Sequence, residues 1–217
     1  MKERSLRVFL IAFVLSGRAL FGGDVPTPVA ENPVYRERAD KIVAKLELGA
    51  GEKEKSARVR DAIAAHYAAV NAVDDALQAK LKELKQSAPA DKAAAEAAAK
   101  TARDEAQPKL DKAHADFLAK LSADLTPEQI DQVKDGMTYG VLQVTWRAYE
   151  KMLPDLTAEQ KAQIMAWLKE AREHAVDAGS SDAKHAWFGK YKGKINNYLA
   201  KAGYDMKAAE KNLLKKP

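Results

Sequence analysis

Apolar side chains recur every three or four residues along most of this chain, a spacing that places them on one face of an α-helix. A first run of this kind occupies Tyr35 to Leu48 and stops at Gly49. A longer run extends from Glu52 to Gln86, with apolar positions that step by three, four and seven residues. Its stripe comprises Ile63, Tyr67, Val70, Leu77, Leu81 and Leu84, and Asp74 interrupts it with a charge. The pattern predicts an all-α protein.

A second long helix is predicted from Asp91 to Leu121, after a short turn that contains Pro89. Two long helices joined in this way form a hairpin, here residues 52–121. Pro108 lies inside the second helix and is expected to kink or interrupt it. Residues 92–100 are rich in alanine and resemble a helical spacer, so we expect the tip of the hairpin to project from a helical bundle.

A short motif occurs twice, as Leu125-Thr126-Pro127-Glu128-Gln129 and as Leu156-Thr157-Ala158-Glu159-Gln160. In each copy the threonine hydroxyl can accept a hydrogen bond from an open N–H at a helix start, and the glutamine can reach back, which makes a capping box. The motif resembles that of the LTxxQ periplasmic stress proteins, which include the small chaperone Spy. That resemblance implies a cradle-shaped helical dimer that shields unfolded proteins.

The aromatic side chains of the last 80 residues suggest a binding site, because planar rings lie there beside amines and amides. Such rings can stack on sugar faces, while lysines and asparagines bond hydroxyls or carboxylates, which suits an acidic oligosaccharide. The alternative is that the rings form the buried stripe of a helix. Gly189 and Gly193, four residues apart in that helix, indicate close approach of another helix or a ligand. The candidate ligand-binding residues here are Tyr139, Trp187, Lys190, Tyr191, Asn196 and Asn197.

Further polar residues nearby add four candidates for chemistry, namely Arg172, His174, Asp177 and His185. With Lys190 they would form an enzyme site only if their side chains converged on one pocket. His174, Asp177 and His185 offer two nitrogens and an oxygen, but they lack the tighter spacing of known metal motifs. We therefore expect no metal and no cofactor, and we name no catalytic residue.

Composition and charge are most informative at the N-terminus, where they indicate a signal peptide. The chain has 217 residues, no cysteine and a net charge of +5, of which residues 1–19 carry +3. Their basic start, the apolar run from Val8 to Leu15 and Gly17-Arg18-Ala19 predict a signal peptide that is cleaved after Ala19. A flexible leader is predicted for residues 20–34. We expect a periplasmic or secreted protein without a stable membrane anchor, and no nucleic acid as its partner.

Several longer strings resemble an uncharacterised family of exported bacterial proteins, domain of unknown function 3826. They are Lys-Asp-Gly-Met-Thr-Tyr-Gly-Val at 134–141, Ala-Arg-Glu-His-Ala at 171–175, Asp-Ala-Gly-Ser-Ser at 177–181, Lys-His-Ala-Trp-Phe-Gly-Lys-Tyr-Lys-Gly at 184–193 and Ile-Asn-Asn-Tyr-Leu at 195–199. The resemblance covers roughly residues 35–205. It implies exported proteins of bacteria that are often rich in polysaccharide-degrading systems, and it supplies no active-site residues.

Together these observations predict a single helical domain over residues 35–217, with the hairpin at 52–121 and aromatic C-terminal helices at 125–205. The leading functional hypothesis is an exported binding or accessory protein linked to polysaccharide utilisation. A Spy-like chaperone for unfolded proteins and an enzyme with a His/Asp/Lys site in the C-terminal third are the alternatives.

Overall fold

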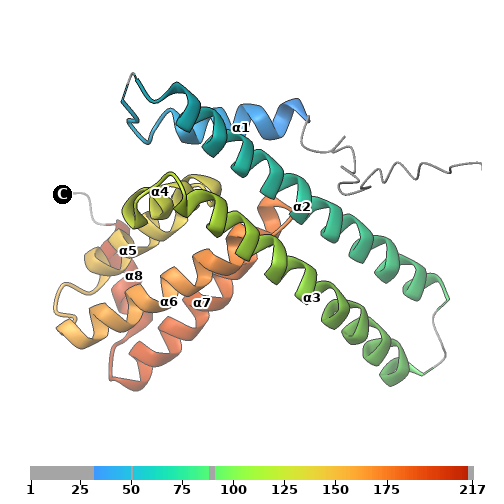
Figure 1. Ribbon diagram of the computed structural model, residues 1–217. Helices are drawn as coiled ribbons and strands as arrows, with labels where there is room; N and C mark the ends of the chain where they lie inside the picture. Colours follow the sequence, from blue (N-terminus) through green and yellow to red (C-terminus); the bar gives the residue numbers. More distant parts are fainter. Residues whose placement is uncertain (1–31, 50, 88–90, 215–217) are drawn as a thin grey trace, which may run out of the picture.

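The computed structural model describes residues 32–49, 51–87 and 91–214, and the predicted signal peptide lies outside these residues. Within them the chain forms helices and no strand, which confirms the all-α prediction (Figure 1). The helices are α1 (Pro33–Val43), α2 (Lys53–Gln86), α3 (Lys92–Ser122), α4 (Pro127–Met137), α5 (Val141–Met152), α6 (Ala158–Val176), α7 (Ser181–Lys201) and α8 (Met206–Leu214). None of the helices described is long and apolar enough to cross a membrane.

Helices α2 and α3 form the predicted hairpin, whose distal half projects from the rest of the molecule (Figure 1). Asp91 caps the start of α3 by accepting a hydrogen bond from the N–H of Ala93. Pro108 does not interrupt α3, which continues through it as one helix. Residues on both sides of Pro108 are mostly good helix formers, and α2 packs along α3, so the loss of one backbone hydrogen bond is tolerated.

Both copies of the short motif are capping boxes at the predicted positions. Thr126 accepts a hydrogen bond from the N–H of Gln129, and Gln129 accepts one from the N–H of Thr126, at the start of α4. Thr157 and Gln160 repeat this exchange at the start of α6. The motif is therefore explained by the local chemistry of two helix starts.

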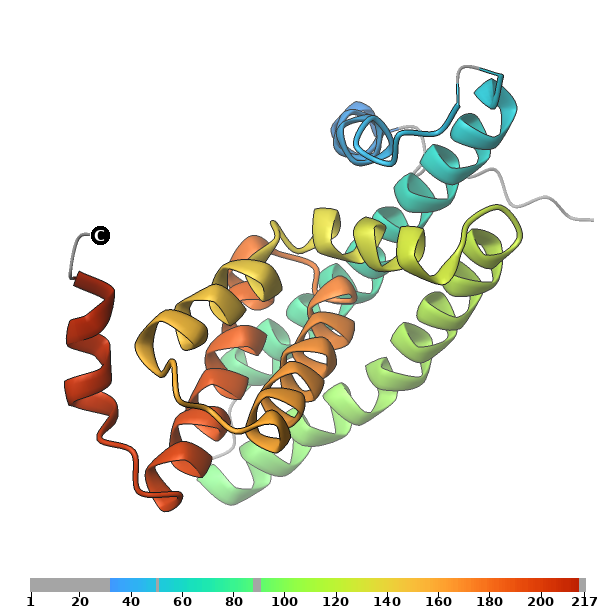
Figure 2. The same ribbon diagram turned by 90° about the vertical axis from the view of Figure 1, so that its left-hand side faces the viewer.

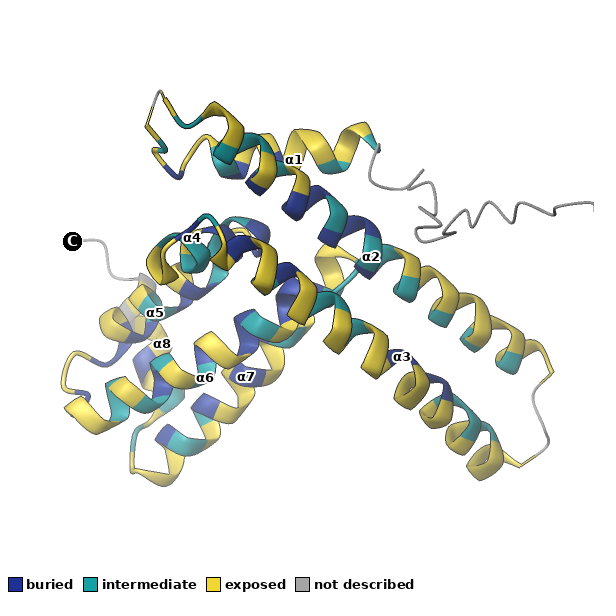
Figure 3. Cartoon of the chain, viewed as in Figure 1, coloured by how far each residue is buried: buried dark blue, intermediate teal, exposed yellow. Residues whose placement is uncertain are grey.

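The buried apolar residues fall into two groups rather than one core. The first group joins α1, α2, the end of α3 and α4 with Val176 at the end of α6, and it includes Ile63, Phe117 and Met137. The second joins α5, α6, α7 and α8. Figure 3 shows buried positions concentrated near the base of the hairpin and within the C-terminal helices, while much of the projecting part is exposed. Helix α8 lies at the left edge of the molecule in Figure 2, apart from α1 at the top.

Two glycines, neither of them at 189 or 193, lie where another element approaches closely. A Cβ on Gly136 in α4 would lie 3.0 Å from Ile42 in α1, and one on Gly179 would lie 2.7 Å from Asp74 in α2. Asp74 thus interrupts the apolar stripe where the turn between α6 and α7 packs on α2. The close approach of another helix expected at Gly189 and Gly193 is wrong, because no protein atom lies within 4 Å of a Cβ at either position and both residues are exposed. Close approach of a ligand there stays a prediction.

Candidate functional site

A layer of charged side chains lies between the two apolar groups, and we call it the charged layer. Its centre is Arg172 on α6, which is only 3% exposed. The guanidinium donates to the carboxylates of Asp131 and Asp135 on α4, with 2.7 Å between Nη1 and Asp135 Oδ1. The charged layer comprises His66, His114, Asp131, Lys134, Asp135, Arg172, Glu173, Asp177 and Lys184.

Two histidines from the hairpin meet α6 in this layer. His114 Nδ1 on α3 lies 2.8 Å from Asp177 Oδ2, and this hydrogen bond raises the pKa of His114. Burial is the largest influence on the pKa of Asp177 and raises it, but His114 and His66 together outweigh burial, so the pKa of Asp177 is lowered. His66 Nε2 on α2 is buried 3.1 Å from Asp177 Oδ1, at an angle that makes no hydrogen bond. Lys134 Nζ pairs with Glu173 at 2.8 Å.

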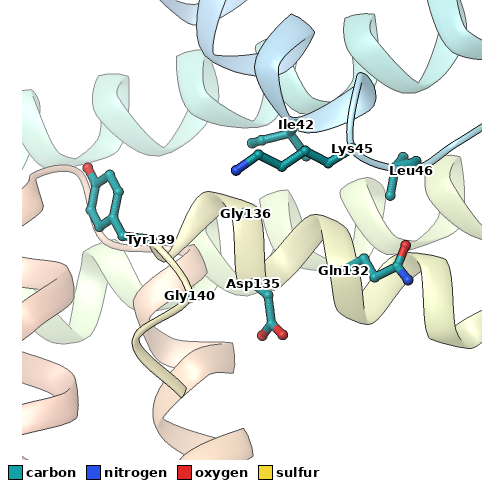
Figure 4. A pocket seen from close by; sticks show the side chains of 8 residues that line it. All are labelled: Ile42, Lys45, Leu46, Gln132, Asp135, Gly136, Tyr139 and Gly140. Atoms are coloured by element: carbon teal, nitrogen blue, oxygen red, sulfur yellow. The ribbon is translucent and has the colours of Figure 1, made fainter. Parts of the chain in front are cut away.

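A cleft of about 540 Å³ opens between α1 and α4, next to this layer. Figure 4 shows Lys45, in the turn that follows α1, extending along the cleft toward Tyr139, with Gln132 on the opposite wall. Asp135 belongs to both features, because it lines the cleft and is held by Arg172. The lining residues are Ile42, Lys45, Leu46, Gln132, Asp135, Gly136, Tyr139 and Gly140.

Tyr139 is the aromatic residue at the edge of this cleft, and its backbone is unusual. Its φ of 59° places a bulky residue in the left-handed region, and Gly140 follows with a φ of 66°. The ring is 53% exposed and stacks on His185, with 5.7 Å between the ring centroids. His185 Nδ1 lies 2.8 Å from the carbonyl oxygen of Ser181, which anchors the imidazole to the start of α7. Such strained conformations cluster at binding and catalytic sites.

Beside this stack, Tyr67 on α2 gathers further cationic and aromatic groups. The Lys184 Nζ lies 5.8 Å from the centre of the Tyr67 ring, and the Arg38 guanidinium carbon lies 6.0 Å from it. Burial raises the pKa of Tyr67 to about 12 and lowers the pKa of Lys184 to about 8. Lys184 Nζ donates to the carbonyl oxygen of Ala175 at 2.9 Å, so it also closes the end of α6.

A second feature, the ring row, follows the outer faces of α6 and α7. Trp187 stacks on His174 with 4.3 Å between centroids, and Lys190 Nζ lies 4.7 Å from the Trp187 ring centre. Tyr191 is buried next to His174, and burial raises its pKa to about 12. Trp167, Tyr198 and Lys194 extend the row, with Lys194 Nζ 4.8 Å from the Trp167 ring centre.

The structure thus divides the ten predicted site residues among several places. His174, Trp187, Lys190 and Tyr191 meet in the ring row, and Tyr139 meets His185 at the cleft. Arg172 and Asp177 belong to the charged layer.

The two remaining candidates lie on α7. Asn196 accepts a hydrogen bond from Tyr149 Oη at 2.7 Å, and Asn197 is exposed.

The three candidate metal ligands have separate neighbours. His174 stacks on Trp187, Asp177 bonds His114, and His185 stacks on Tyr139. Among the residues described, no group of three or more histidines and carboxylates has an arrangement that could hold a metal ion.

Sequence reasoning did not find several of the polar residues that the structure brings together. Lys45 and Gln132 carry no local signal, because their significance depends on α1 crossing α4. Lys134 and Asp135 lie inside the string at 134–141 that carries the family resemblance, but their partners on α6 are nearly 40 positions away in the sequence. His66 occurs among the buried residues of α2, so a polar residue on an apolar stripe was the available signal.

Comparison with protein families gives one match, over residues 33–217, to the family described as "Protein of unknown function (DUF3826)". The match covers all the helices described above. Among curated proteins, none matches the sequence. The chain belongs to the DUF3826 family.

Proposed function

We propose that this protein binds an acidic oligosaccharide in the cleft between α1 and α4. The observation that carries the proposal is Tyr139, whose exposed ring is held at the edge of the cleft by a strained backbone. An exposed aromatic ring beside a cavity offers a flat apolar surface to the C–H face of a sugar. A cleft of about 540 Å³ has the size of a small-molecule site.

The polar groups of the cleft favour a ligand that carries both hydroxyls and a carboxylate. Lys45 is exposed and has no ion-pair partner among the described residues, so its amine is free to bind a carboxylate. Gln132 offers an amide that can donate to or accept from hydroxyls. Asp135 is paired with Arg172, which it shares with Asp131. Lys45 is the charged residue of the cleft lining that has no ion-pair partner among the described residues, and its amine favours an anion.

The ring row is the other place where an acidic saccharide could bind, through Trp187 and Lys190. In the structure the Trp187 ring already contacts His174 on α6 and Lys190 on its own helix. A sugar would have to displace one of these neighbours to stack there. The ring of Tyr139 has one protein ring beside it and is more than half exposed, so the cleft supports the proposal better.

The setting we propose for this binding is outside the cytoplasm, in polysaccharide utilisation. The basic start and apolar run of residues 1–19 support export, and the resemblance to exported proteins of polysaccharide-degrading bacteria supports the saccharide. An accessory protein of this kind would hold acidic fragments for enzymes that cleave or transport them.

Calorimetric titration with a matched pair of ligands tests the proposal. The pair is a short oligosaccharide of uronic acids and the same oligosaccharide with its carboxylates reduced to alcohols. We expect saturable binding of the acidic ligand and binding at least tenfold weaker for the neutral one, because only the first can pair with Lys45. Equal affinity for both ligands, or no heat from acidic oligosaccharides of several compositions, would contradict the proposal.

A further inference from the structure

The charged layer forms a polar connection between the hairpin and the C-terminal helices. His66 on α2 and His114 on α3 face Asp177 on α6, and Lys134 on α4 faces Glu173. The apolar groups on either side share only a small apolar contact, in which Val176 of α6 packs with the first group, and each has its own buried aliphatic and aromatic residues. Polar interfaces between such units permit relative motion, since little apolar surface is exposed when they separate.

The permanent charges of the layer do not balance. Lys134, Arg172 and Lys184 supply three positive charges at pH 7, whereas Asp131, Asp135, Glu173 and Asp177 supply four negative ones. Arg38 of α1 is a further cation near Lys184, but it makes no ion pair with a carboxylate of the layer. Among the paired groups of the layer, one carboxylate therefore lacks a counter-charge unless an imidazole takes up a proton. In a partly buried layer an uncompensated charge is costly, because water screens it poorly.

His114 is the imidazole placed to carry that proton. Its Nδ1 lies 2.8 Å from Asp177 Oδ2, and its Nε2 lies 3.6 Å from Glu173 Oε2, so a protonated ring points one N–H toward each carboxylate. Three other groups near Asp177 and Glu173 oppose or compete with a proton on His114. They are His66 from α2, Lys134 from α4 and Lys184 from α7. Lys134 and Lys184 disfavour a further positive charge, but each is bonded elsewhere, to Glu173 and to the end of α6.

His66 is less well placed than His114 to carry the proton. It is 3% exposed and stacks on Phe117 with 4.2 Å between ring centroids, which buries the imidazole against an apolar surface. Its Nε2 approaches Asp177 Oδ1 without hydrogen-bond geometry. A charged form of His66 would therefore gain less from the shared carboxylate than a charged His114.

We propose that His114 is a proton-operated latch that holds the hairpin against the C-terminal end of α6. With a proton on the imidazole, the charged layer is balanced and α3 is fixed to Asp177 and Glu173. Without it, Asp177 loses its ionic partner and the hairpin loosens from the C-terminal helices, while both apolar groups stay folded. The raised pKa of His114 agrees with this geometry, because the folded protein favours the charged ring.

Hydrogen–deuterium exchange of the full chain at pH 6 and pH 8 tests the latch, after correction for the intrinsic pH dependence of amide exchange. We expect the segments around His66, His114 and Asp177 to exchange several-fold faster at pH 8. Segments inside the second apolar group, such as those around Leu168 and Ile195, should keep the same protection at both pH values. A shift of one pKa unit corresponds to about a tenfold change in the ratio of docked to open protein.

His114→Gln removes the charge and keeps a side chain that can hydrogen-bond Asp177. This variant should exchange at both pH values as the wild type does at pH 8, whereas His174→Gln, outside the charged layer, should keep the wild-type response. Because His114 is partly exposed, the variant should fold. A variant that retains the wild-type pH response would overturn the latch, as would a titration by nuclear magnetic resonance that places the pKa of His114 at or below its ordinary value.

Discussion

At the scale of single residues, Arg172 shows most clearly how this fold uses charge. Its side chain is 3% exposed and pairs with two carboxylates of α4, one of which lines the cleft. A buried ion pair gives little net stability compared with an apolar replacement of both partners, but removal of one partner leaves a charge that water screens poorly. Arg172 thus fixes Asp135 and the wall of the cleft at the same time.

Replacement of Arg172 should therefore be costly. Arg172→Met keeps the volume of the side chain and leaves Asp131 and Asp135 without a counter-charge. We expect the free energy of unfolding in urea to fall by about 2–4 kcal/mol, below the upper end of the usual range because both carboxylates are partly exposed. As a control, Lys194→Met removes an exposed pair with Glu170 and should change stability by less than about 0.5 kcal/mol. Equal effects of the two substitutions would show that Arg172 is not an organising residue.

At the scale of helices, the start and end signals of the sequence predict much of the structure. The observed α2 begins one residue after its predicted start and ends at Gln86, and both capping boxes stand where the threonine and glutamine indicate. These features depend on residues within a few positions of one another, so local chemistry determines them. The expected break at Pro108 fails, because propensity and packing along the whole helix outweigh one proline.

The site could be predicted only in part, because its members come from helices distant in sequence. Tyr139 and His185 were recognised as candidates, but the stack between them depends on how the α4–α5 turn meets the start of α7. Lys45 becomes significant only through the crossing of α1 over Gly136. The helical spacing of the sequence could not show that Phe188 is fully buried whereas Trp187 is only half-buried. The residue types in the sequence indicated candidate site residues, whereas the contacts between them could be known only from the fold.

Two glycines in helices give a matched test of helix packing. Gly189→Ala should raise the free energy of unfolding by about 0.5–1 kcal/mol, because an open helical position gains a better helix former. Gly136→Ala should lower it by about 1–3 kcal/mol, because the new methyl meets Ile42 at 3.0 Å and forces α1 away from α4. Thermal or urea unfolding measures both. If Gly136→Ala stabilised the protein as Gly189→Ala does, α1 would not pack on α4 in the manner described.

At the scale of the whole molecule, stability should depend on pH through the charged layer. His114 has a raised pKa in the folded state, so its contribution is complete below its ordinary value of 6.5 and is lost as the pH rises through the higher folded value. Asp177 has a lowered pKa, so its contribution is lost as the pH falls below about 3.8. Stability should be greatest between these limits.

Urea unfolding at a series of pH values tests this dependence of stability on pH. From pH 6.5 to 8 we expect the free energy of unfolding of the wild type to decline. The pKa of Lys184, lowered to about 8, acts in the opposite direction in the upper part of this range and above it, because the folded state then binds fewer protons than the unfolded chain. His114→Gln keeps only this second effect, so its free energy of unfolding should stay level or rise slightly. A wild type that gains stability steadily from pH 6.5 to 8 would contradict the assigned role of His114.

The central claim is that the acidic ligand binds at Tyr139 in the cleft rather than at the ring row. The most direct measurement is one calorimetric titration series, in which a uronic-acid oligosaccharide is added to the wild type, Tyr139→Ala and Trp187→Ala. Loss of a stacked ring at the binding site should weaken affinity at least tenfold, equivalent to about 1.4 kcal/mol. If the ligand binds in the cleft, Tyr139→Ala should lose at least tenfold in affinity and Trp187→Ala should keep the wild-type affinity. The reverse result would contradict binding in the cleft.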